Sequence, residues 1–321
     1  SAAVQSSQQK RRNSAAVQTR IPAMKRSFLL IGLVVTSYLS ATADDAVPLK
    51  LTQRYRVNVL PDVFETRTKT ISWKPSETAV IVCDVWDAHH CLNAVRRLDE
   101  MLPRMNEVLA KARGQGVLII HAPSSCMEPY KDHPGRKLAL AAPKAKNLPA
   151  DIGVWCMKIP AEEKGKYPID QTDGGEDDDL AEHADWHAKL KAQGRNPKAP
   201  WKKQHDGITI KDGDAISDSG VEIWNLLESR GVSNVILVGV HTNMCVLGRP
   251  FGLRQMAKNG KHVVLMRDMT DTMYNPKMPP YVSHFKGTEL IVEHIEKFVC
   301  PTITSDQFLG GKAFRFKGDV N

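Results

Sequence analysis

Three residues of this 321-residue chain, Cys245, Asp84 and Lys211, have types and positions that suit nucleophilic catalysis. Each stands just past a short apolar run, and a helix should begin close to Cys245. A thiol is mostly protonated at neutral pH, so a nucleophilic cysteine needs help to become a thiolate. We expect the helix start and Asp84, acting as the base, to give that help, while Lys211 stabilises the negative charge.

Each of these residues also has an ordinary structural explanation. A cysteine after a buried strand is, by itself, more often a small core residue. An aspartate at a strand end is often a helix cap, and a lysine after a short edge run such as 208–210 is usually solvated. Spacing alone therefore leaves both interpretations open.

Short apolar runs predict the sheet that would bring these residues together. They are continuous and rich in β-branched residues, and they lie at 79–83, 117–120, 235–240 and 263–266. Such runs are typical of parallel strands buried on both faces, and helical spacing separates them. The pattern predicts a three-layer α/β/α domain, doubly wound around a mostly parallel sheet. Ligands of such sheets bind beyond the carboxyl ends of the strands, where Asp84 and Cys245 lie.

One long segment interrupts this alternation of strands and helices. Residues 123–207 are rich in proline, glycine and charge, and they form a large insertion on the carboxyl side of the strands. A loop of this length is usually a binding element or else disordered. We expect a lid with helix around 180–193.

The N-terminal residues have the pattern of an export signal. Met24 begins a basic stretch, an apolar segment follows at 28–39, and Ala41-Thr42-Ala43 has the small residues of a cleavage site. The apolar segment is too short to span a bilayer, which takes about 20 residues. We expect a periplasmic or secreted protein, cleaved near Ala43 and without stable membrane insertion; a retained anchor is the alternative.

Composition and these boundaries give the predicted organisation. It comprises an upstream artefact or disordered segment (1–23), a signal peptide (24–43), an N-terminal extension (44–76), the α/β domain (77–308) and a tail (309–321). The net charge is +8, but no basic run alternates with aromatic residues, which argues against nucleic-acid binding. Among six cysteines, Cys126 and Cys156 could pair in an oxidising compartment.

Three segments resemble the signature segments of the isochorismatase-like cysteine hydrolases, which include nicotinamidase, N-carbamoylsarcosine amidase and isochorismatase. They are AVIVCD, ending at Asp84, ITIK, ending at Lys211, and GVHTNMCV, which contains Cys245. The resemblance covers about 77–308, with the insertion outside it. It implies that Asp84, Lys211 and Cys245 form a catalytic triad.

The resemblance also implies how the rest of the site is built. The peptide between Val240 and His241 would be cis, and the backbone N–H groups of His241 and Cys245 would form an oxyanion hole. Side chains past the strand ends should line the substrate pocket: Trp86, His121, Thr242 and Asn243. The chain has Trp86, His241 and Asn243 where the family often has glutamine, alanine and aspartate, so the substrate stays open.

Metal binding is a further alternative. Nicotinamidases bind a metal through an aspartate and two histidines after the second strand, a spacing that Asp132, His133 and His121 do not reproduce. Asp87, His89 and His121 are candidate ligands for a divalent ion such as zinc, although the expected chemistry requires no cofactor.

The resemblance thus implies an exported cysteine hydrolase of a small carbonyl compound, with amide hydrolysis through a cysteine thioester as the expected reaction. One alternative is a vinyl-ether hydrolase of the isochorismatase type, which needs no thiolate. Another is an exported binding protein that keeps the fold without catalysis. The expected partners are a small-molecule substrate and further copies of the chain in a homo-oligomer.

Overall fold

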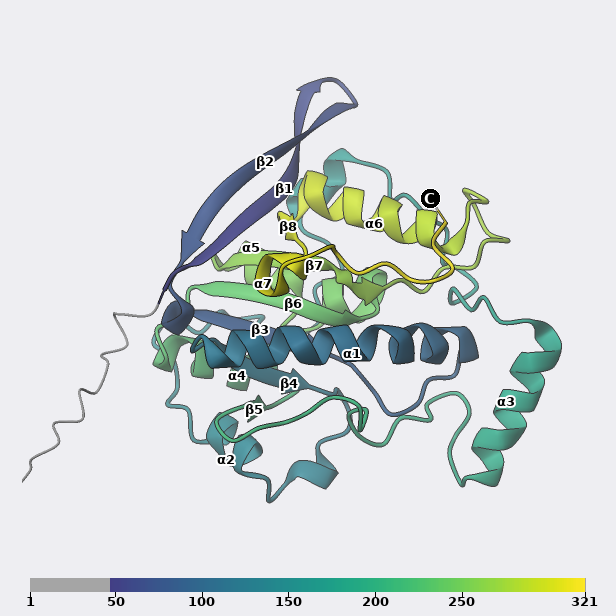
Figure 1. The fold of residues 1–321 in the computed structure, drawn as a ribbon, viewed down its shortest axis with the longest axis horizontal. Coiled ribbons are helices and arrows are strands. Elements are labelled where there is room, and N and C mark those ends of the chain that lie inside the picture. Colours follow the sequence, from purple (N-terminus) through teal and green to yellow (C-terminus); the bar gives the residue numbers. More distant parts are fainter. Residues whose placement is uncertain (1–46, 321) are drawn as a thin grey trace, which may run out of the picture. The chain divides into compact units, whose positions relative to one another are not determined.

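The computed structural model describes residues 47–320 (Figure 1). The predicted signal peptide at 24–43 and the segment before it lie outside the described residues. Within 47–320, no helix has the length and apolar character needed to cross a membrane.

Eight strands form one sheet, and four of them coincide with the predicted apolar runs. In chain order they are β1 (Leu49–Leu60), β2 (Val63–Trp73), β3 (Thr78–Cys83), β4 (Leu118–Ala122), β5 (Ala215–Ile216), β6 (Asn234–Val240), β7 (His262–Asp271) and β8 (Thr302–Ile303). Their order across the sheet is β2-β1-β8-β7-β6-β3-β4-β5. Every pair from β8 to β5 is parallel, and the β1–β2 hairpin joins β8 in antiparallel orientation. The sheet is therefore mostly parallel.

Helices cover both faces of this sheet. They are α1 (Leu92–Gly114), α2 (Pro134–Leu140), α3 (Leu180–Ala192), α4 (Gly220–Ser229), α5 (Leu253–Lys258), α6 (His284–Phe298) and α7 (Asp306–Leu309). Alternate residues of β3 point to opposite layers, because side chains alternate along a strand. Ile81 packs in the layer that contains α4, α5 and α6, whereas Val80 and Val82 pack against α1. The predicted three-layer α/β/α fold is confirmed.

The hairpin of β1 and β2 was not predicted, since residues 44–76 were expected to be an extension of the domain. Its burial alternates only weakly, and most of β2 is exposed. Two ion pairs attach β1 to α6, from Arg54 and Arg56 to Glu296, at 2.6 and 3.4 Å. The hairpin extends the sheet beyond β8, as Figure 1 shows in purple and blue.

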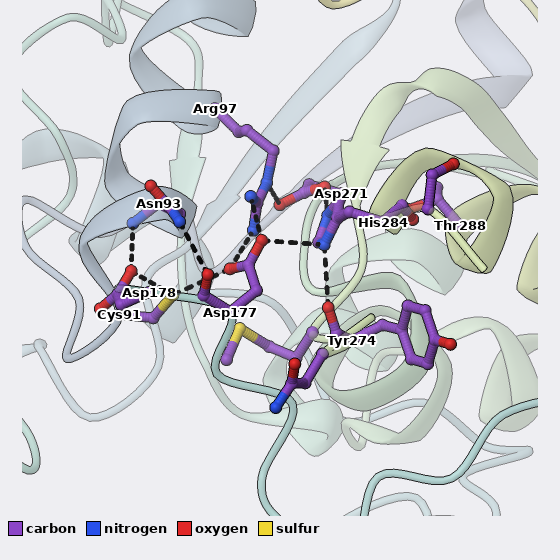
Figure 2. Close-up of polar contacts among 12 residues, drawn as sticks. Cys91, Asn93, Arg97, Asp177, Asp178, Asp271, Tyr274, His284 and Thr288 are labelled. Carbon is purple, nitrogen blue, oxygen red and sulfur yellow. Dashed lines mark hydrogen bonds and ion pairs between the residues drawn. The ribbon is translucent and has the colours of Figure 1, made fainter. Parts of the chain in front are cut away.

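The insertion at 123–207 carries α3 almost where the sequence predicts a helix. Just before α3, Asp178 accepts the backbone N–H groups of Leu92 and Asn93 at 2.8 and 2.7 Å. These N–H groups belong to the first turn of α1, whose own N-cap residue, Cys91, makes no side-chain cap. The insertion therefore caps α1 from outside the helix (Figure 2).

Replacing Asp178 by alanine should lower the free energy of unfolding by about 1–2 kcal/mol, because two helix N–H groups lose their acceptor. Urea denaturation measures this loss. Asp185→Ala is the matched control, since Asp185 is an exposed residue on α3. Equal stability of the two variants would contradict the capping role.

All six cysteines are free and buried. The suggested bridge between Cys126 and Cys156 is therefore absent.

Candidate active site

Asp84 directly follows β3 at the carboxyl edge of the sheet, and it is fully buried. Its backbone φ of 47° is left-handed, a costly conformation for a residue other than glycine and one that often occurs at functional sites. One carboxylate oxygen accepts the backbone N–H of Ser124 at 2.8 Å, and the other accepts the Nε–H of Arg249 at 2.8 Å. The carboxylate also forms a hydrogen bond with the Cys245 thiol. Three groups from two other segments of the chain thus converge on one buried acid.

Cys245 lies in a five-residue π-helical turn, Thr242–Val246, directly after β6. Single π-helical turns are rare, and those that occur are often found at functional sites. The Thr242 hydroxyl anchors this turn through hydrogen bonds to the Thr270 hydroxyl, at 2.7 Å, and the Asp271 carbonyl oxygen, at 2.9 Å. The turn that presents the thiol is therefore held from β7.

The backbone has an unusual conformation where strand β6 leads into this turn. The Val240–His241 peptide is cis, as the family resemblance implies. Gly239 has a φ of 110°, and a Cβ at this position would lie 2.0 Å from the carbonyl oxygen of Cys83. Only glycine permits this close approach of β6 to β3, and the approach brings Cys245 beside Asp84.

Arg249 is the cation of the site. It follows Cys245 by one helical turn, and its backbone N–H donates to the Cys245 carbonyl oxygen at 3.0 Å. Pro250 comes next, and a residue before proline is disfavoured in the helical region, so the helix expected to begin close to Cys245 is interrupted and α5 starts later. The guanidinium lies over the ring of Trp155, 4.7 Å from its centroid, and these contacts direct it toward Asp84.

The prediction that Lys211 supports Asp84 is wrong. Residues 208–210 are not a strand, and the edge strand is β5, which begins four residues after Lys211. Lys211 therefore precedes its strand at the amino edge of the sheet, whereas Asp84 follows β3 at the carboxyl edge. The Lys211 side chain is exposed, and its backbone N–H donates to Asp214. Arg249, four residues after Cys245, could have been found from its helical spacing to the cysteine.

Burial and charge decide where the proton lies. Burial raises the pKa of the Cys245 thiol, and the negative charge of Asp84 raises it further. Burial also raises the pKa of Asp84, whereas Arg249, the thiol and the Ser124 N–H lower it. The thiol therefore holds its proton in the resting site, and Arg249 opposes the rise in the pKa of the neighbouring acid. This arrangement suits proton transfer at the moment of attack.

Cys245 lines a cavity of about 460 Å³, a size suited to a small molecule. Asn243 and Met244 line it from the same turn. The opposite wall comes from the insertion and includes Trp155 and Tyr167. The Tyr167 hydroxyl donates to the Asn243 carbonyl oxygen at 3.4 Å, which ties the insertion to the turn. The insertion thus forms part of the pocket, as expected of a lid.

The residues predicted for the substrate pocket divide into two groups. Asn243 lines the 460 Å³ cavity. Trp86 does not line it; this ring lies beside Asp84 and stacks on Trp201, with ring centroids 4.3 Å apart. Thr242 does not line that cavity, because its hydroxyl is committed to β7. His121 is also fully buried elsewhere, between Gln204 and Asp214, so its prediction as a pocket residue is wrong.

A buried charge network supports the turn from behind (Figure 2). Arg97 donates to Asp271 at 2.8 Å and to Asp177 at 2.7 Å, and His284 lies 2.9 Å from Asp271. Asp271 and Asp177 raise the pKa of His284 to about 9 against the opposing effect of its burial. His241, by contrast, is neutral, since burial lowers its pKa to about 3.

The charged His284 makes stability depend on pH. The folded protein binds this proton more tightly than the unfolded chain, whose histidine pKa is about 6.5. Its contribution is therefore complete below pH 6.5 and is lost as the pH rises through about 9. We expect the free energy of unfolding to fall by roughly 3 kcal/mol over this interval. Urea denaturation across that range should show the fall in the native chain and a flatter profile in His284→Gln.

The structure does not assemble the predicted metal ligands. Asp87 accepts hydrogen bonds from Arg195 and from two backbone N–H groups, His121 is bound to Asp214, and His89 stacks against other rings. Asp132 is exposed and His133 caps α2, so the nicotinamidase pattern does not fit either.

A different group of possible ligands lies close together in residues 47–320, namely Cys91, Asp177 and Asp178. Their carboxylates are already occupied by Arg97, His284 and the start of α1 (Figure 2). An arginine at 2.7 Å from Asp177 is unfavourable for a cation there. We therefore derive no step through a metal.

Scans of the sequence against protein-family models and curated proteins find no match. Solved structures with a similar chain path include a cysteine hydrolase from Pseudomonas syringae pv. phaseolicola 1448A, with 16% identity, a TM-score of 0.42, and coverage of 73% of this chain and 91% of that one. An isochorismatase from Pseudomonas putida KT2440 has 13% identity, a TM-score of 0.41, and coverage of 72% and 89%. An isochorismatase family protein from Burkholderia thailandensis has 12% identity, a TM-score of 0.38, and coverage of 72% and 93%. The chain is thus similar to isochorismatase and cysteine hydrolase structures, but at these TM-scores its chemistry has to rest on its own residues.

Proposed function

We propose that this protein is an exported hydrolase of small carbonyl compounds, related to the isochorismatase-like cysteine hydrolases, and that amides are its substrates. The observation that carries the proposal is the hydrogen-bonded set of Cys245, Asp84 and Arg249 beside a cavity of about 460 Å³. Export is supported by the signal-like residues at 24–43.

In the first half of the reaction, Asp84 takes the proton of the Cys245 thiol while the sulfur attacks the carbonyl carbon. The backbone N–H groups of His241 and Cys245 are proposed to stabilise the negative oxygen of the tetrahedral intermediate. The intermediate then collapses to a thioester, and the leaving amine takes the proton from Asp84. The Asp84 carboxylate is regenerated in this step.

In the second half, water attacks the thioester carbon and gives a proton to Asp84. The C–S bond then breaks, the acid product leaves, and Asp84 returns the proton to the sulfur. Arg249 acts as a positioning residue in both halves. Its guanidinium fixes one oxygen of Asp84 and offsets the negative charge that sulfur and carboxylate share during attack.

A panel of small primary amides, assayed for ammonia release, tests this function. We expect release from at least one member, with the same rate in the presence and absence of a chelator. Absence of release across the panel, with a folded protein, would contradict the amidase proposal. A rate that falls with the chelator would contradict the metal-free mechanism.

A further inference from the structure

A second cavity, of about 380 Å³, lies at the carboxyl ends of β7 and β8. Its walls come from β1, β7, α6 and the C-terminal tail that follows α7. In Figure 1 this tail runs back along α6 in yellow. The catalytic residues proposed above do not line this cavity, so it is a separate site.

An irregularity of β7 places two charged residues, Arg267 and Asp268, in this cavity. Leu265 of β7 pairs with Leu237 of β6, but the next aligned pair is Thr270 with Gly239. Strand β7 therefore advances five residues while β6 advances two. Such bulges redirect side chains and are frequent near binding sites. Arg267 lies within this bulge, and its side chain lines the cavity.

Arg267 is a largely buried cation without an acidic partner. Among residues 47–320, no carboxylate oxygen lies within 4.0 Å of its guanidinium, which donates instead to the Thr302 hydroxyl at 3.1 Å. Burial lowers the pKa of Arg267, and the positive charge of nearby Arg54 lowers it further, against the opposing effect of the more distant acids Glu296, Asp268 and Asp306. Arg54 also lines the cavity. Two guanidinium groups thus face the same space, and their repulsion would be relieved by an anion.

The acids that line the cavity do not fill this role: Glu289 pairs with Lys286 at 2.7 Å, and Asp319 pairs with Arg315 at 3.3 Å. Asp268 lines the same cavity, but its carboxylate accepts the N–H and hydroxyl of Ser305 and the N–H of Phe314. Its oxygens are therefore committed to the chain that closes the cavity. Arg54 has a partner in Glu296, at 2.6 Å, which leaves Arg267 as the unpaired charge.

Three phenylalanines form an apolar wall of the cavity. The Phe285 and Phe316 rings stack with centroids 5.6 Å apart, and Phe314 meets Phe316 edge-on at 5.1 Å. All three line the cavity. Aromatic faces of this kind favour flat apolar groups, so charge and apolar surface are combined in one small space.

We propose that this cavity binds a small organic anion, whose carboxylate or phosphate contacts Arg267 and whose flat apolar body packs against Phe285, Phe314 and Phe316. Arginine forms paired hydrogen bonds with either anion, so the two head groups share one recognition chemistry. The volume of about 380 Å³ suits a single-ring compound.

Isothermal titration calorimetry of the full chain with 3-phenylpropionate, phenyl phosphate and inorganic phosphate tests this site. At least one of the two aromatic anions should bind with a stoichiometry of one, and the stronger of them identifies the head group. Inorganic phosphate should bind more weakly than phenyl phosphate, because it makes no contact with the aromatic wall. Failure of both aromatic anions to bind would overturn the proposal.

Two variants and one control assign the binding to this cavity. Arg267→Gln should raise the Kd of the tighter-binding probe about ten- to hundred-fold, the range expected when a charged hydrogen bond is lost. Arg67→Gln removes the same charge on exposed β2 and should leave Kd unchanged. Phe316→Ala, in the tail, should also weaken binding without altering the sheet. Equal binding by Arg267→Gln and the native chain would overturn the assignment.

Discussion

Replacing Cys245 by alanine is expected to abolish amide hydrolysis, with kcat falling by about 10⁴-fold or more. The sulfur forms the bond to the carbonyl carbon, and among residues 47–320 no other thiol lines the 460 Å³ cavity. Cys245 is nearly buried in a turn held by Thr242, so loss of one sulfur atom should leave the fold intact. Ammonia release with the best amide of the panel measures the loss, and thermal unfolding checks the fold.

Cys83→Ala is the matched control for that variant. Cys83 is fully buried at the end of β3, and its thiol lies 3.9 Å from the Val240 carbonyl oxygen, close to the same site. It lacks a hydrogen bond to Asp84, so its loss should retain most of the activity. Retained activity in Cys245→Ala would contradict the thioester mechanism and point to hydrolysis without a thiolate.

Replacing Arg249 by methionine is expected to lower kcat by about 10²- to 10³-fold, the usual range for loss of one electrostatic contact at a reacting centre. Arg249 lowers the pKa of Asp84, so without it the pKa of this buried carboxyl rises. A smaller fraction of Asp84 is then ionised, and able to act as the base, at neutral pH. The acid limb of kcat/KM against pH should consequently move to higher pH, which a merely structural role of Arg249 would not cause.

Lys211→Met tests whether Arg249 is the cation that supports Asp84, or Lys211, as the family resemblance implies. Lys211 is exposed at the amino edge of the sheet, so its loss should leave both kcat and the pH profile unchanged. Arg249→Lys should recover part of the activity, since it restores the charge but not the planar contact with Trp155. Loss of activity in Lys211→Met alone, with Arg249→Met active, would contradict the assignment.

The sequence predicted that Asp84 and Cys245 lie together, because both directly follow continuous apolar strands. The carboxyl end of such a strand is visible in the sequence as the end of an apolar run. Asp84 and Cys245 could therefore be placed at one edge of the sheet from the residue pattern alone. The helix of the insertion was also predictable, since its residues at 180–193 have good helix propensity between proline- and glycine-rich segments.

The cation could not be placed in the same way. The run at 208–210 has the residue types of a strand, but the edge strand is the two-residue β5, which is too short to show any period. Lys211 was therefore assigned to the wrong edge of the sheet. Arg249 was overlooked although its four-residue spacing from Cys245 indicates it, because its contact with Trp155 of the distant insertion is not visible in the sequence. The hairpin of β1 and β2 escaped prediction because its exposed strands lack a clear apolar face.

Selective alkylation tests most directly whether Cys245 is a nucleophile that Asp84 activates. The six buried thiols compete for limiting iodoacetamide, and peptide mass spectrometry follows the rate at each one. We expect Cys245 to react first, because it lines the cavity and Asp84 can take its proton as the sulfur attacks. Asp84→Asn should slow this reaction by removing the proton acceptor, although loss of the negative charge also lowers the pKa of the thiol. Alkylation of Cys245 no faster than Cys83 or Cys300, or a rate unchanged in Asp84→Asn, would contradict the proposed activation.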